Sequence, residues 1–170
     1  NPYPMNMNFP ILLLAALIPL LVGMIWYHPK AFGNAWMKIT GLSEEKLKEG
    51  NMLMIFGVTY LFCVFIAFVM QFLVVHQYHV FSVLANEPGV MDPTTEIGAY
   101  YKNFMDQHGQ NFRTFKHGAL HGFMSGLFLL LPALGVTALF ERKNFKYIFI
   151  NGGYWVITLM LMGGVICQFA

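Results

Sequence analysis

Four of the six histidines fall into two pairs whose spacing suits metal coordination. His76 and His79 are three residues apart, and His117 and His121 are four apart. Residues at these spacings share one face of a helix. Imidazole is a good ligand for zinc, copper, iron and nickel, and helical bundles build metal sites from facing pairs. All four histidines are therefore candidate ligands of a transition metal, with a haem held between the pairs as a less favoured cofactor.

A purely structural role for the same histidines stays open. Histidines at the ends of membrane helices meet water and lipid headgroups and need no ion. His121 differs because it lies about one turn inside an apolar segment, where a polar side chain requires a partner. His108 lies in the connection between the pairs and could join the cluster, whereas His28 lies near the opposite membrane face and cannot. A metal site and a hydrogen-bond network are both compatible with this pattern.

Other patterns that carry chemistry are missing from the chain. It has no nucleophile elbow, phosphate loop or dinucleotide fingerprint. Every Asp and Glu lies in a connection or at its edge, which weakens a proton-coupled transporter as an interpretation. Cys63 and Cys167 lack metal-type or redox-type spacing and are expected to be buried spectator thiols. Whether the protein is an enzyme is left open by these residues.

The elements that position the histidines are expected to be membrane helices. The chain is 57% hydrophobic and 11% charged, whereas soluble domains are about 25% charged. Crossing the hydrocarbon takes about 20 apolar residues, and four segments qualify. They are about 9–27, 52–75, 118–140 and 147–169. The sequence predicts an all-α integral membrane four-helix bundle, forming a single domain over residues 1–170. Its long connection between the second and third helices brings both histidine pairs to one membrane level.

Glycine and proline patterns predict how these helices pack and bend. Gly118, Gly122 and Gly126 recur every four residues and form one stripe on the third helix. Close backbone approach is a main source of attraction between helices in lipid, so the stripe predicts a helix-packing surface. Pro19 and Pro132 lie inside apolar segments and are expected to kink them. Most aromatic residues near the segment ends are expected to be headgroup anchors.

The basic residues predict an orientation. The first and third connections hold seven Lys and Arg residues, against three on the other side. The positive-inside rule then places these two connections in the cytoplasm, with both termini and the long connection outside. The net charge of +2 gives no basis for a nucleic-acid partner. The expected partners are the lipid bilayer and a homo-oligomer or larger membrane complex. Met5 or Met7 is the expected initiator.

Several motifs resemble one known family. The first is Trp26-Tyr27-His28-Pro29, followed by Phe32-Gly33, Ala35-Trp36-Met37 and Gly41-Leu42-Ser43. The run from Phe115 to Gly122, Leu131-Pro132, the turn 140–143 and the run 151–155 are similar to the same family. Together these motifs resemble the "domain of unknown function 1761" membrane proteins over nearly the whole chain, apart from its first residues and 82–112. The resemblance implies a small bacterial four-helix membrane protein and implies no activity.

The leading hypothesis is therefore a binding or accessory protein of the bacterial inner membrane. The first rival is a redox protein or enzyme that uses the outward-facing histidines to hold a metal or haem. The second is a small transporter formed by oligomers, because four helices alone enclose little pore.

Overall fold

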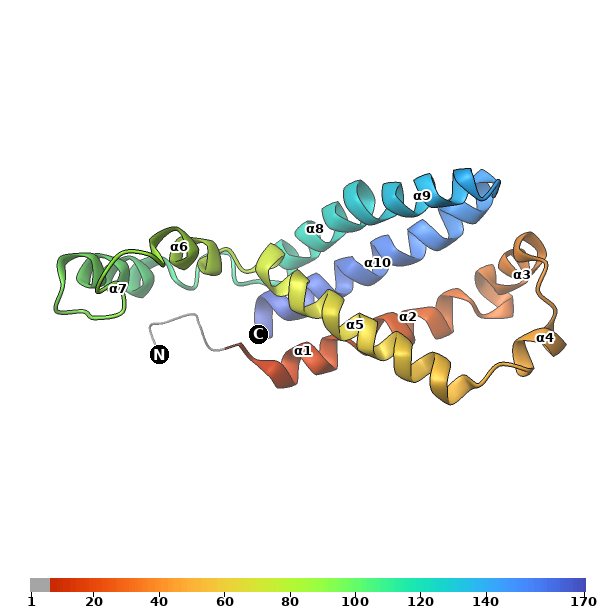
Figure 1. The fold of residues 1–170 in the computed structure, drawn as a ribbon, viewed down its shortest axis with the longest axis horizontal. Helices are drawn as coiled ribbons and strands as arrows, with labels where there is room; N and C mark the ends of the chain where they lie inside the picture. Colours follow the sequence, from red (N-terminus) through yellow and green to blue (C-terminus); the bar gives the residue numbers. More distant parts are fainter. Residues whose placement is uncertain (1–6) are drawn as a thin grey trace.

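The computed structural model describes residues 7–170, so Met5 lies outside the described part of the chain. The fold is all-α, with four helices long and apolar enough to cross a membrane, as the sequence predicted. The first comprises α1 (Phe9–Ala15) and α2 (Ile18–Trp26), and the second is α5 (Met52–Val74). The third comprises α8 (Phe115–Ser125), η2 (Gly126–Leu130) and α9 (Leu131–Phe140), and the fourth is α10 (Phe145–Phe169) (Figure 1).

Both spans that contain a central proline are irregular beside it. The first span is interrupted at Ala16 and Leu17, shortly before Pro19. Proline has no N–H, so the helical bond that it would donate four residues back is lost. In addition, the Pro19 carbonyl accepts a hydrogen bond from the Tyr154 hydroxyl at 2.9 Å, which ties this part of the span to α10. In the third span, η2 is a π-helical turn that ends two residues before Pro132.

α10 is the central helix of the bundle. Half of its most apolar window is buried, against 11–22% in the other three spans. It contacts all three of the other spans, and its most extensive contact is with α8. A Cβ atom added to Gly118 would lie 2.2 Å from the Gly163 carbonyl oxygen, and one added to Gly122 would lie 1.9 Å from that of Leu159. The glycine faces of α8 therefore let the two backbones touch.

The connections gather at the two ends of the bundle (Figure 1). One end carries η1 (Pro29–Gly33), α3 (Asn34–Thr40), α4 (Glu44–Lys48) and the turn between α9 and α10. The other end carries the carboxyl terminus and two helices that project away from the bundle, α6 (Gln77–Leu84) and α7 (Glu96–His108). These two helices share a small core of buried Val90, Tyr101 and Met105. The first and third connections thus lie at the same end.

Candidate metal centre

Three of the four candidate histidines converge at the end of the bundle that carries α6 and α7. His76, His117 and His121, here called the histidine triad, place one ring nitrogen each within 4.8 Å of the others. The Nε2 atom of His76 lies 2.8 Å from Nε2 of His117 and 3.3 Å from Nε2 of His121. Tetrahedral zinc with bonds of 2.0–2.1 Å separates its ligand atoms by roughly 3.3 Å. The triad is therefore close to the size of a zinc site.

The helical conformation is interrupted after α5, and this interruption turns His76 toward α8. α5 ends at Val74, and Val75 leaves the helical conformation with φ −107° and ψ 92°. His76 is then the residue that precedes α6, and its half-buried ring meets α8 with ring centroids 5.0 Å from His117 and 4.7 Å from His121. His76, which lies between α5 and α6, thus completes the triad.

The local sequence of α8 presents the other two rings on one face. The Thr114 hydroxyl oxygen accepts the His117 N–H at 3.3 Å and so caps the helix, which begins at Phe115 rather than near Gly118 as predicted. This added turn places His117 and His121 in one continuous helix, with ring centroids 4.6 Å apart. Gly118 follows His117 directly and lies against α10, which holds α8 in place beside the triad.

The remaining candidate histidines lie outside the triad. His79 is exposed on α6, with its ring centroid 6.3 Å from that of His76. Both residues follow the break at Val75 and share one helical turn, in which the His79 N–H donates a hydrogen bond to the His76 carbonyl at 2.9 Å. The His76 ring meets α8, whereas His79 is not part of the group of possible ligands. His28 lies at the opposite end, where its Nδ1 accepts the Lys30 N–H at 3.2 Å. Within the described chain, the group of possible ligands contains no carboxylate or thiolate.

A pocket opens beside the triad. Its volume is about 350 Å³, and it is lined by His76, Gln77, Val80, Phe104, His108, Asn111 and Phe112. The Gln77 side chain donates a hydrogen bond to the Asn111 carbonyl at 2.9 Å, which ties α6 to the loop before α8. His108 therefore lines the same cavity as a triad member. Phe104, Asn111 and Phe112 also line this cavity and were not predicted, although aromatic residues in a polar connection were an available signal.

Burial and the neighbouring imidazoles favour the neutral form of His76. Burial makes the largest contribution to lowering its pKa below the ordinary value, and His121 and His79 add to it. Metal ligation requires the neutral ring, so this protonation state is compatible with a ligand role for His76. An unfolded histidine has a pKa near 6.5. Below that pH the unfolded chain binds more protons at this position than the folded chain, so acid destabilises the fold.

We expect the thermal unfolding midpoint of the metal-free protein to fall as the pH is lowered from 7.5 to 5.5. Replacing His76 with glutamine should make this fall less steep, because a side chain with the depressed pKa has been removed. Scanning fluorimetry in detergent at several pH values measures the slope. His28→Ala is the control, since His28 is exposed at the other end of the bundle. An unchanged slope in His76→Gln would contradict the prediction.

One comparison with known proteins identifies a family, and its description gives no activity. A family model described as "Protein of unknown function (DUF1761)" matches residues 11–167, which is nearly the whole chain. No curated protein and no solved structure matches the chain.

Proposed function

Because the chain belongs to the DUF1761 family, whose description assigns no activity, we propose from the geometry that it binds one divalent transition-metal ion through the histidine triad. The convergence of three ring nitrogens within 4.8 Å carries this proposal. Three imidazoles leave the fourth position of a tetrahedral ion open for water or a ligand. The pocket that His76 lines adjoins the triad and offers a ligand a place to bind.

The donor set favours zinc or another nitrogen-preferring metal. Three neutral nitrogens suit zinc, copper, iron or nickel, whereas magnesium and calcium require oxygen ligands. A bare ion is favoured over haem because the triad rings are in contact with one another. Their centroids are 4.6–5.0 Å apart, which leaves no slot for a flat macrocycle between two axial histidines.

The charge distribution supports a position for this site on the outer side of a bacterial inner membrane. The end of the bundle opposite the triad carries the seven basic residues of the first and third connections, and such residues favour the cytoplasm. With the termini outside, the triad would receive its ion from the periplasmic side. The proposed role is that of a metal-binding or accessory protein, with the α6–α7 projection above the site.

Metal titration of the purified protein tests the proposal. We expect protein treated with a chelator and then titrated with Zn²⁺ in detergent to take up one ion per chain, by isothermal calorimetry and by elemental analysis after desalting. Because neutral imidazole is the ligand, protons compete with the ion, and uptake should weaken as the solution is acidified. His28→Ala should bind as the wild type does. A wild-type protein that retains no stoichiometric Zn²⁺, Cu²⁺ or Ni²⁺ would contradict metal binding and favour a hydrogen-bond network.

A further inference from the structure

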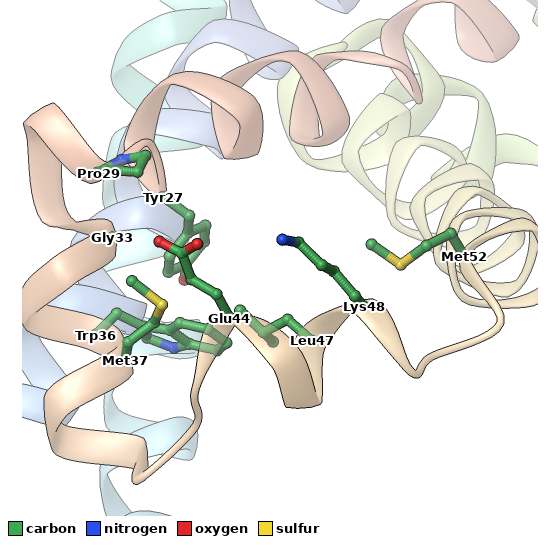
Figure 2. Close-up of a pocket in the computed structure, with 9 residues that line it drawn as sticks. All are labelled: Tyr27, Pro29, Gly33, Trp36, Met37, Glu44, Leu47, Lys48 and Met52. Atoms are coloured by element: carbon green, nitrogen blue, oxygen red, sulfur yellow. The ribbon is translucent and has the colours of Figure 1, made fainter.

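A second cavity lies at the end of the bundle opposite the triad (Figure 2). Its volume is about 580 Å³. It is lined by Tyr27, Pro29, Gly33, Trp36, Met37, Glu44, Leu47, Lys48 and Met52. These residues come from the connection between the first two spans and from its two edges. This cavity, here called the interfacial pocket, shares no lining residue with the pocket beside the triad.

The interfacial pocket lies at the boundary of the membrane-spanning segments. The first span ends at Trp26, directly before Tyr27, and the second span begins at Met52. One end of each span therefore lies at the wall of the pocket. This is the level of the boundary between the hydrocarbon core and the lipid headgroups. The Met52 side chain is exposed, so the pocket continues into the apolar surface of α5. A ligand with a polar head and an apolar tail fits this position.

The aromatic wall of the pocket is held by the central helix. The Tyr27 hydroxyl donates a hydrogen bond to the Asn151 side chain at 2.9 Å, and the Trp26 indole donates one to the Ile150 carbonyl at 3.0 Å. The Tyr27 ring also packs edge-on against Trp36, with centroids 5.4 Å apart. These contacts leave a fixed aromatic surface facing α4.

α4 adds one charge of each sign to the opposite wall. Glu44 and Lys48 are one helical turn apart, and both are exposed. Within residues 7–170 no ion pair joins them. Figure 2 shows the Glu44 carboxylate and the Lys48 amino group extending from α4 to the same side, into the space between Tyr27 and Met52. The pocket thus offers a separate anion and a separate cation above an apolar, aromatic surface.

We propose that the interfacial pocket binds one phospholipid with an ethanolamine headgroup. The Lys48 amino group pairs with the lipid phosphate, and the Glu44 carboxylate pairs with the headgroup ammonium. The Trp36 ring adds a cation–π contact to that ammonium. The acyl chains leave past Leu47 and Met52 along α5. Phosphatidylglycerol lacks the ammonium and would leave Glu44 facing an anionic headgroup, so the charge pattern selects a zwitterionic lipid. This site is independent of the proposed metal site.

Native mass spectrometry of the full chain in non-ionic detergent tests this assignment. We expect the wild type to bind one dioleoyl phosphatidylethanolamine and to bind dioleoyl phosphatidylglycerol about tenfold more weakly, the ratio that one charge-assisted hydrogen bond supplies. Glu44→Gln should remove the preference between the two lipids, and Lys48→Gln should weaken the binding of both. Lys46→Gln and Glu49→Gln are matched controls, because they change the same charges at exposed positions of 41–50 outside the pocket lining.

Two results would overturn the proposal. The first is equal binding of both lipids by the wild type, and the second is equal loss of binding in the control and test variants. A second readout is the rise in the thermal unfolding midpoint on addition of phosphatidylethanolamine. That rise should disappear in Lys48→Gln and persist in Lys46→Gln. A rise of equal size in both variants would also count against the pocket.

Discussion

Replacing His117 and His121 together with alanine is expected to reduce metal content from one ion per chain to background. Both residues supply ring nitrogens to the triad, and only His76 would remain. Losing an outer partner of a metal ligand typically weakens binding 10–100-fold, so losing two ligands should weaken it by more than about a hundredfold. Calorimetric titration with Zn²⁺ measures the affinity, and elemental analysis measures the content.

His79→Ala is the matched control for this double variant. It removes an exposed imidazole close to the triad, and its ring centroid lies 6.3 Å from that of His76. It should retain one ion with little change in affinity. If His79→Ala lost the ion as completely as the double variant, the four-histidine site inferred from spacing would replace the triad. If the double variant were strongly destabilised without any metal in the wild type, the histidines would be a structural network.

Replacing Gly122 with leucine is expected to prevent the normal assembly of the bundle. A Cβ atom there would lie 1.9 Å from the Leu159 carbonyl oxygen and 2.6 Å from the Leu159 carbonyl carbon. Backbone atoms cannot move aside as a flexible side chain would, so α8 and α10 must separate. Overpacking costs about 1–3 kcal/mol even where side chains can adjust, and this backbone clash should cost at least about 3 kcal/mol.

Gly57→Leu makes the same substitution at a position with open space. Gly57 lies on α5, and an added Cβ atom there would meet no atom within 4 Å. This variant should keep the wild-type elution profile and thermal midpoint in detergent, whereas Gly122→Leu should aggregate or unfold at a much lower temperature. Similar behaviour of the two leucine variants would show that the α8–α10 contact is not essential to the fold.

The four spans were predictable because hydropathy and length suffice to identify a membrane helix. The ends of the spans depend on local hydrogen bonds, and the Thr114 cap starts the third span before the apolar run begins. Pairing His117 with His121 was predictable because one helix continues through both. His76 and His79 also share one helical turn, but that turn follows the break at Val75, and the group of possible ligands in the described residues contains His76 and not His79. Spacing alone does not predict this difference between the two residues.

The pockets were beyond the reach of the sequence because they depend on contacts between distant elements. Trp26 and Tyr27 were expected to be headgroup anchors, as interfacial aromatic residues usually are. In the structure their polar atoms bond Ile150 and Asn151, which are 124 positions away along the chain. Periodicity within one segment contains no information about such partners. The cavity that these contacts help to shape could therefore be recognised only from the packed helices.

The long stretch of chain between two triad ligands has a thermodynamic consequence. His76 and His117 are 41 positions apart, at opposite ends of the connection that contains α6 and α7. An ion bound to both would act as a removable cross-link that closes this loop. In a chain-entropy model, closing a loop of this length disfavours the unfolded ensemble by roughly 4 kcal/mol. Loading with metal would then fasten the second and third spans to each other, and a chelator would release them.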